Sequence, residues 1–200
     1  MVRGWMSVFV FAVAVWMAGF GTVWAGDRAA LIERLAEGGY VVYWRHAATD
    51  RRQGDRDFRD MDQCAFQRNL DARGQAQART VGAGFVTREI PVGEVLTSDF
   101  CRNRETAEIA FGRYERVKNL WNLPAAHASG LSRDALVSGL RERLGTPPAD
   151  TSRNTVIVGH NLNLQAAAQV RIDEGVMAVF EPLGDARFVL LGTLEPADFE

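Results

Sequence analysis

Short apolar runs alternate with helical patterns along most of the chain. Three runs rich in β-branched and aromatic residues predict buried strands, at residues 40–44, 95–97 and 155–159. A further short strand is expected at residues 117–120, and a closing hairpin at residues 176–180 and 188–191. Apolar residues at helical spacing predict helices over residues 27–37, 71–85, 102–111, 133–144 and 162–170. This alternation of helix and strand is typical of an α/β sheet. The long polar stretch at residues 49–68 reads as a surface loop or lid.

The first 25 residues have the pattern of a secretory signal. Residues 5–20 are almost uninterruptedly apolar, and Val23-Trp24-Ala25 then provides the end that a signal peptidase recognises. We therefore predict a signal peptide over residues 1–25 and one domain over residues 26–200, in the periplasm or secreted. A retained single-span anchor is the alternative, because the apolar run approaches the length that crosses a bilayer. The polar Gly26-Asp27 pair favours cleavage, after which no stable membrane insertion is expected.

The two cysteines, Cys64 and Cys101, bear on the same question of compartment. In an oxidising compartment an even count favours a disulfide. A loop of this size closed by a disulfide would stabilise the fold by roughly 3–4 kcal/mol. Two separate buried thiols are one alternative, and a thiol-based redox protein is another, although no Cys-x-x-Cys spacing is present. We predict a structural disulfide.

Composition and charge exclude several classes of protein. The 200 residues are 47% hydrophobic and 24% charged, which argues against wholesale disorder, a collagen repeat or a coiled coil. A formal net charge of −2 gives no reason to expect nucleic acid as a partner. Every basic residue except Lys118 is an arginine, and arginine is the better bidentate ligand for phosphate.

Cationic and titratable side chains follow three of the predicted strands. Arg45-His46 follows the first, Arg102 begins the helix after the second, and His160 follows the third. The carboxyl ends of strands in an open α/β sheet form the edge where ligands bind, and helices that start there favour anions. Singly, each arginine could be a salt-bridge partner and each histidine a loop or capping residue. Together they predict a site for a tetrahedral oxyanion, most simply phosphate. His127 lacks this context, and the histidine spacing matches no zinc motif, so no metal or other cofactor is expected.

Three segments carry a more specific pattern. A strand followed by Arg-His occupies residues 40–47, the spacing Ser-x-x-x-Arg-x-x-x-Thr-Ala occupies residues 98–107, and a strand ending in Gly-His occupies residues 156–160. In this order they resemble the signatures of the histidine phosphatase superfamily, the phosphoglycerate-mutase-like enzymes. The resemblance implies a three-layer α/β/α sandwich with a mostly parallel central sheet.

The resemblance also implies catalytic roles for four residues. His46 would attack phosphorus and become a phosphohistidine, while Arg45, Arg102 and His160 would hold the phosphoryl oxygens. Water would then hydrolyse the phosphoenzyme. His46 must be neutral at its attacking nitrogen and His160 is expected to be protonated, which predicts a bell-shaped dependence of rate on pH.

Two features depart from the family pattern. Ala47 stands where the first signature has glycine, and we expect it to be tolerated unless the backbone there has positive φ. The general acid that protonates the leaving group is not evident. Glu108, Asp134, Glu142 and Glu174 are candidates without distinguishing context. A leaving group of low pKa, such as phosphohistidine or an anomeric phosphate, would need little acid help.

Two further residues are predicted to bind substrate. Thr49 and Arg52 occupy positions that contact the phosphoryl group in the mutase-like branch, although a solvated charged loop explains Arg52 equally well. The sequence thus predicts a phosphomonoesterase that acts on a phosphorylated small molecule or glycan. A sugar phosphate or a lipopolysaccharide-core phosphate is the expected substrate, by analogy with exported relatives. A catalytically silent phosphate- or glycan-binding module is the alternative.

Overall fold

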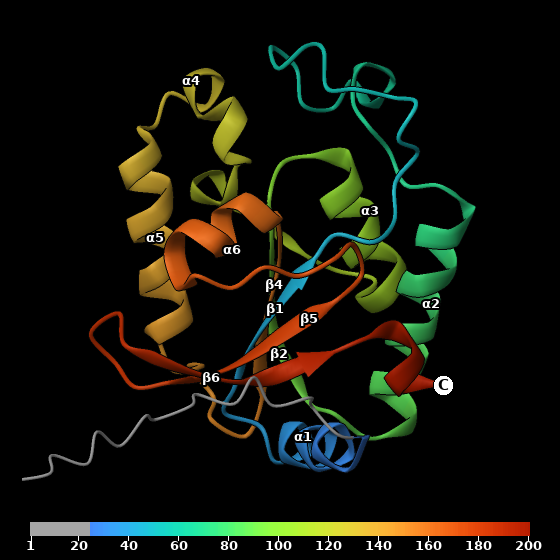
Figure 1. Ribbon diagram of the computed structural model, residues 1–200, viewed down its shortest axis with the longest axis vertical. Coiled ribbons are helices and arrows are strands. Elements are labelled where there is room, and N and C mark those ends of the chain that lie inside the picture. The colour runs from blue at the N-terminus through green and yellow to red at the C-terminus, as the bar shows by residue number, and fades with distance from the viewer. Residues whose placement is uncertain (1–24) are drawn as a thin grey trace, which may run out of the picture.

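The runs predicted as buried strands form the centre of a six-stranded sheet in the computed structural model, which describes residues 25–200 (Figure 1). The sheet has the strand order β3-β2-β4-β1-β5-β6. Its strands are β1 (Val41–Arg45), β2 (Val92–Thr97), β3 (Glu115–Arg116), β4 (Asn154–Gly159), β5 (Met177–Pro182) and β6 (Phe188–Leu194). The predicted signal peptide, apart from Ala25, lies outside the described residues.

Helices cover both faces of this sheet. They are α1 (Ala25–Glu37), α2 (Ala72–Thr87), α3 (Cys101–Phe111), α4 (Ala126–Ser129), α5 (Arg133–Gly145) and α6 (Asn161–Ala168). Figure 1 shows α2 and α3 on one side of the sheet and α5 and α6 on the other. Among residues 25–200, no helix has the length and apolar character needed to span a membrane.

The side chains of β1 show how the two layers of core arise. Val42 and Trp44 pack in a cluster with residues of α1, α2 and α3, such as Leu35, Val81 and Ala107. Val41 and Tyr43 instead join residues of α5 and α6 in a second cluster. Successive strand residues point to opposite faces, so a strand that is apolar at every position needs cover on both. The predicted three-layer α/β/α sandwich is confirmed.

The description of the sheet as mostly parallel is correct for only one part of it. The neighbouring pairs β3–β2, β2–β4 and β4–β1 are parallel, whereas β1–β5 and β5–β6 are antiparallel. The short connection at residues 183–187 forces β6 to reverse direction, as the predicted hairpin requires. Parallel strands therefore make up the half of the sheet that contains β1, β2 and β4.

The predicted strand at residues 117–120 is wrong. Lys118–Leu120 is a single 3₁₀ turn, and only Glu115–Arg116 pairs with β2. Val117 and Leu120 are both buried. Their spacing of three residues lets a helical turn bury both side chains, which an extended strand would direct to opposite faces.

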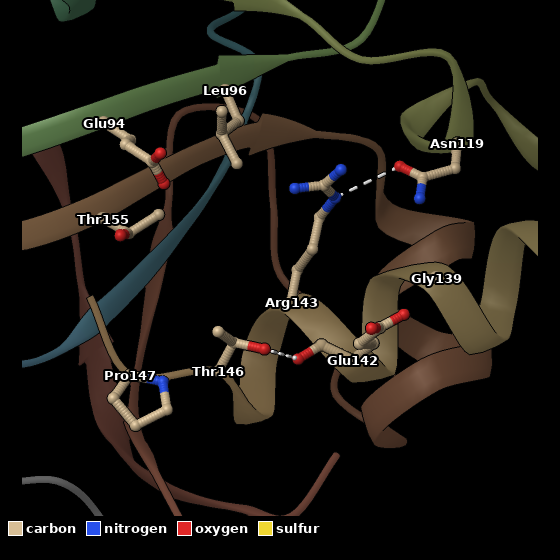
Figure 2. Close-up of a pocket in the computed structure, with 9 residues that line it drawn as sticks. All are labelled: Glu94, Leu96, Asn119, Gly139, Glu142, Arg143, Thr146, Pro147 and Thr155. Atoms are coloured by element: carbon tan, nitrogen blue, oxygen red, sulfur yellow. Dashed lines mark hydrogen bonds between the residues drawn. The ribbon is translucent and has the colours of Figure 1, made fainter. Parts of the chain in front are cut away.

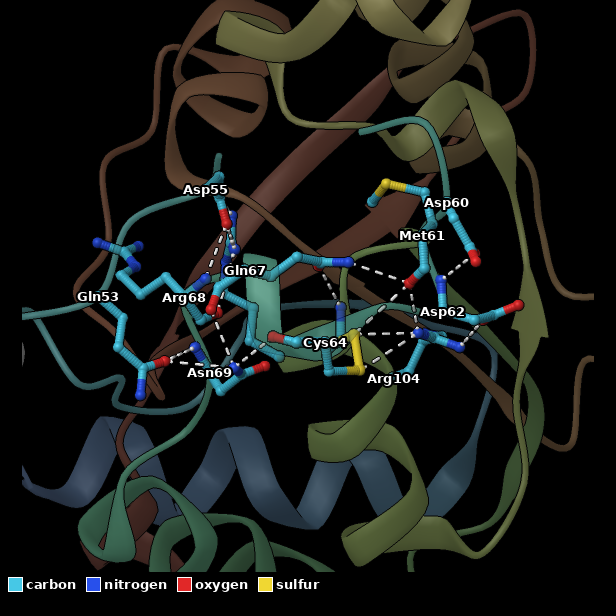
Figure 3. Close-up of a disulfide and its surroundings, with 12 residues drawn as sticks. Gln53, Asp55, Asp60, Met61, Asp62, Cys64, Gln67, Arg68, Asn69 and Arg104 are labelled. Atoms are coloured by element: carbon cyan, nitrogen blue, oxygen red, sulfur yellow. Dashed lines mark hydrogen bonds and ion pairs between the residues drawn. A yellow bond between two sulfur atoms is a disulfide. The ribbon is translucent and has the colours of Figure 1, made fainter. Parts of the chain in front are cut away.

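The predicted disulfide between Cys64 and Cys101 is confirmed. It joins the long loop at residues 49–68 to the first residue of α3 (Figure 3). Within this loop, only Cys64–Phe66 is helical, and Leu70 pairs with Thr49 across the base of the loop. The disulfide therefore fixes the second half of the loop beside the start of α3.

A double Cys64→Ser/Cys101→Ser variant is expected to unfold more easily. The bond closes a loop of 37 residues, so its loss should lower the unfolding free energy by roughly 3–4 kcal/mol. Urea denaturation of the variant and the wild type measures this difference. An equal midpoint for both proteins would contradict a structural role, and loss of all turnover in a folded variant would favour thiol chemistry.

Candidate active site

The carboxyl ends of β1, β2 and β4 bring the predicted catalytic residues together. His46 follows β1, Arg102 lies in the first turn of α3 after β2, and His160 follows β4. The rings of His46 and His160 are 5.6 Å apart between centroids, and both side chains are only 2% exposed. The centroid of the Phe100 ring lies 4.6 Å from Cζ of Arg102 and 5.0 Å from the centroid of the His160 ring. The predicted convergence at this edge of the sheet is therefore present.

Tyr43 fixes the backbone at His160. Its buried hydroxyl accepts a hydrogen bond from the His160 N–H at 2.8 Å and donates one to the His160 carbonyl at 2.9 Å. A Cβ at Gly159 would lie 2.1 Å from this hydroxyl oxygen. Glycine before His160 is thus required by the close approach of Tyr43, which holds the second histidine in place.

A Tyr43→Phe variant is expected to lose both of these hydrogen bonds. Leaving the buried His160 N–H without a partner should cost about 1–3 kcal/mol of unfolding free energy, although the carbonyl keeps its bond from the Leu164 N–H. The freed His160 should also lower turnover. Tyr40→Phe is the matched control, because the Tyr40 hydroxyl contacts Arg34 on the surface. Denaturation midpoints and kcat of the two variants test this. Equal losses in both would contradict the role of Tyr43.

His46 has one ring nitrogen engaged by the backbone. Its Nδ1 lies 2.9 Å from the carbonyl oxygen of Ala47, which can only accept, so Nδ1 carries the proton. Nε2 then holds the lone pair. Burial, followed by the charge of Arg102, lowers the pKa of His46 well below its usual value, and the ring is neutral at neutral pH. His46 therefore has the protonation state of a nucleophile.

Ala47 causes no backbone strain where the family pattern has glycine. It is not among the described residues with positive φ, and its buried N–H donates to the Thr106 hydroxyl at 3.1 Å. The expectation that alanine is tolerated at this position is confirmed.

His160 differs from the sequence-based expectation in its protonation state. Burial lowers its pKa well below the usual value, and the charge of Arg102 lowers it further. The ring is therefore neutral in this structure, not protonated, because water is excluded and cations surround it. Its Nε2 lies 3.0 Å from the Ser98 hydroxyl, and its buried Nδ1 has no hydrogen-bond partner among residues 25–200.

Three guanidinium groups surround the two imidazoles. The charges of Arg45, Arg68 and Arg102 each lower the pKa of both histidines. Arg68 was not among the predicted site residues, because it lies in the loop at residues 49–68 and follows no strand. The buried Nε atoms of the three arginines have no hydrogen-bond partner within the described residues.

Two carboxylates hold these arginines. Asp55 accepts two hydrogen bonds from Arg102, at 2.8 and 3.2 Å. Glu174, whose side chain is 9% exposed, lies 3.5 Å from both Arg45 and Arg68. Both acidic residues are in loops, and Glu174 was only one of four acids that the sequence left open.

The two predicted substrate-binding residues have different positions. The Thr49 hydroxyl donates to Glu174 at 2.9 Å, which places Thr49 beside the arginines. Arg52 instead lies on the surface with its side chain 90% exposed, paired with Asp50 at 2.9 Å. The structure thus brings Thr49 to the cluster and leaves Arg52 outside it.

The other candidate acids lie in separate places. Glu142 lines a cavity of about 270 Å³ with Asn119, Arg143 and Thr155 (Figure 2). This cavity adjoins the amino-terminal part of β4, at the opposite end of the strand from His160. Glu108 lies in a groove beside the disulfide, and Asp134 is in the first turn of α5. Glu174 is the one of the four that contacts the arginines of the cluster.

Comparison with known proteins identifies a family that part of this chain resembles. Residues 41–124, which include His46 and Arg102, match the model of the histidine phosphatase superfamily (branch 1). The resemblance to the histidine phosphatase superfamily is confirmed over these residues. As a histidine phosphatase-like chain it has the fold of several solved structures, although no curated protein matches its sequence.

Three of these structures illustrate the likeness. The protein histidine phosphatase SixA complexed with tungstate is 13% identical, with 80% of this chain and 99% of that chain covered and a TM-score of 0.56. TTHB049 from Thermus thermophilus is 18% identical, with coverages of 78% and 99% and a TM-score of 0.54. A SixA-type protein from Agrobacterium tumefaciens is 20% identical, with coverages of 80% and 99% and a TM-score of 0.52.

Proposed function

We propose that this histidine phosphatase-like protein hydrolyses phosphomonoesters through a phosphohistidine at His46. The observation that carries the proposal is the neutral His46 ring with its Nε2 lone pair, set among three guanidiniums and a second imidazole. A neutral imidazole is a nucleophile, and guanidiniums neutralise the charge of a transferring phosphoryl group without a metal.

The reaction would proceed in two displacements. His46 Nε2 forms a bond to phosphorus while the bond from phosphorus to the leaving oxygen breaks. Water then attacks the phosphohistidine, which releases inorganic phosphate and restores neutral His46. The unpartnered nitrogens of Arg45, Arg68, Arg102 and His160 are the donors that would bind the phosphoryl oxygens. A bound dianion would also raise the pKa of His160, so the ring would be protonated in the complex.

The substrate would be a phosphoryl group on a good leaving group. Asp55 and Glu174 both contact guanidiniums, so each carboxylate accepts hydrogen bonds in this structure. Neither is placed as the acid that would protonate a leaving group. We propose a phosphorylated sugar, including a lipopolysaccharide-core phosphate, and an anomeric phosphate is the form whose leaving oxygen needs least acid help. The predicted export signal supports this class, since it would place the protein in the periplasm or outside the cell. The solved relative that is named a protein histidine phosphatase favours phosphohistidine as a second candidate.

A labelling experiment tests the mechanism. The purified mature chain is mixed with ³²P-labelled substrate, quenched in alkali and digested. Acid-labile label on the peptide that contains His46 is expected, and unlabelled protein without turnover across the panel would favour the silent binding module. The panel of anomeric and primary sugar phosphates, phosphohistidine peptide and lipopolysaccharide fragments ranks the substrates by kcat/KM. Cell fractionation with the full-length chain tests export.

A further inference from the structure

Asp55 binds the arginine that the phosphoryl group would need. Its two carboxylate oxygens accept hydrogen bonds from the two terminal nitrogens of Arg102, at 2.8 Å and 3.2 Å. This parallel pair of bonds is the arrangement by which a guanidinium binds two oxygens of a phosphate. Asp55 therefore resembles, in charge and geometry, one edge of the anion that the site would receive.

The same carboxylate also organises the backbone of the loop. Oδ1 of Asp55 accepts a third hydrogen bond, from the N–H of Arg68 at 3.0 Å (Figure 3). The Arg68 carbonyl accepts a hydrogen bond from Nη1 of Arg102 at 3.3 Å. The guanidinium of Arg68 points to Glu174 instead. Asp55 thus joins the guanidinium of Arg102 to the backbone of Arg68.

Exposure indicates from which side a ligand enters. The side chain of Arg102 is 1% exposed and both histidines are 2% exposed. Asp55 is 20% exposed, and the neighbouring side chain of Arg68 is 29% exposed. Solvent therefore reaches the cluster on the side of the loop, where Asp55 lies, and also at Arg45, whose side chain is 18% exposed.

The two halves of the loop are held very differently. Residues 61–69 are tied by the disulfide, by the amide of Gln67 to Met61 and Cys101, and by Asn69 to Cys64. Residues 51–57 are partly or fully exposed, and a Cβ at Gly54 would meet no atom within 4 Å. Phe58 then packs against Phe100. The segment with Asp55 is joined to this second half by hydrogen bonds alone, such as those from the Arg56 N–H to the Phe66 carbonyl at 2.9 Å and from the Asn69 N–H to Gln53 Oε1 at 3.1 Å.

We propose that Asp55 sets the affinity of the site for phosphoryl groups: it holds Arg102 in this structure and is displaced when an oxyanion binds. The proposal rests on the proposed function, since it assumes that Arg102 binds the phosphoryl oxygens. Two anions cannot share one edge of the Arg102 guanidinium, which is 1% exposed, because their repulsion there is weakly screened. An oxyanion that binds the two terminal nitrogens of Arg102 must therefore first replace the contact with Asp55.

The Asp55→Asn variant separates this role from a structural one. Asparagine has the same shape without the charge, so it competes less with the oxyanion. We expect tungstate and inorganic phosphate to bind the variant at least about tenfold more tightly than the wild type, equivalent to about 1.4 kcal/mol. Asp57→Asn is the matched control, because Asp57 pairs with the exposed Arg59 in the same loop. Its affinity should equal that of the wild type.

Calorimetric titration measures these affinities. Unchanged or weaker binding by a folded Asp55→Asn variant would overturn the proposal, as would an equal gain in Asp57→Asn.

Hydrogen exchange of the wild type gives a second test that needs no variant. Tungstate should speed amide exchange at residues 51–57 and leave residues 61–69 unchanged, and slower exchange at residues 51–57 would also overturn it. A wild type that is labelled at His46 while Asp55→Asn gains no affinity would refute this inference alone. Absence of both labelling and oxyanion binding would refute the proposed function as well.

Discussion

Replacing His46 with alanine is expected to lower turnover of any phosphomonoester substrate by at least about 10⁴-fold, because no other group replaces the covalent nucleophile. The buried ring of His160 cannot substitute for it. Nε2 of His160 is 3.0 Å from the Ser98 hydroxyl, and its backbone is held by Tyr43. The loss should appear in kcat, since the three arginines that would bind the phosphoryl oxygens remain.

The measurement is kcat and KM with the best substrate of the panel. His127→Ala is the matched control, since His127 is exposed and lies 6.2 Å from Phe58 in the outer part of the loop. It should retain wild-type kcat. Residual turnover in His46→Ala within about tenfold of the wild type would show that His46 is not the nucleophile. Tungstate should still bind the variant, which confirms that the fold of the site survives.

The strand-end residues of the site could be predicted because their signal is local. Val41–Arg45 and Asn154–Gly159 are buried at nearly every position, and such strands must be covered on both faces. Their carboxyl ends must then lie at one edge of the sheet, which brings His46 and His160 together. The prediction needed no knowledge of the loops.

The groups that complete the site had no such signal. Asp55, Arg68 and Glu174 lie in loops, where position depends on long-range contacts such as the Cys64–Cys101 disulfide. The partner that sets the tautomer of His46 is the backbone carbonyl of Ala47, an atom that every residue has. The two-residue strand β3 likewise contains only charged side chains, so no periodicity could indicate it.

Acidification is expected to destabilise the fold. The pH range of this loss is set by the pKa values of the two buried histidines, His46 and His160. Burial and the nearby arginines hold the pKa values of His46 and His160 well below 6.5, the value of an unfolded chain. The unfolded chain therefore binds protons first as pH falls, and the unfolding free energy decreases with it. The stabilisation is fully present above about pH 6.5 and is lost as pH falls from there towards the lowered folded-state values.

The size of this effect follows from linkage. In the window where the unfolded ring is protonated and the folded ring is not, each histidine lowers the unfolding free energy by about 1.4 kcal/mol per pH unit. Where both rings are within this window, their contributions to the slope add. The arginines of the cluster remain charged throughout this range.

Urea denaturation at several pH values measures this loss. A His46→Gln/His160→Gln variant should have a much flatter profile between about pH 7 and about pH 5, because neither amide titrates. His127→Gln should keep the wild-type slope, since His127 lies on the surface. An equally steep profile in the double variant would assign the acid sensitivity to other groups and contradict the lowered pKa values. Added phosphate should reduce the slope of the wild type, because a bound dianion favours the protonated His160 ring and so offsets part of the cost of acid.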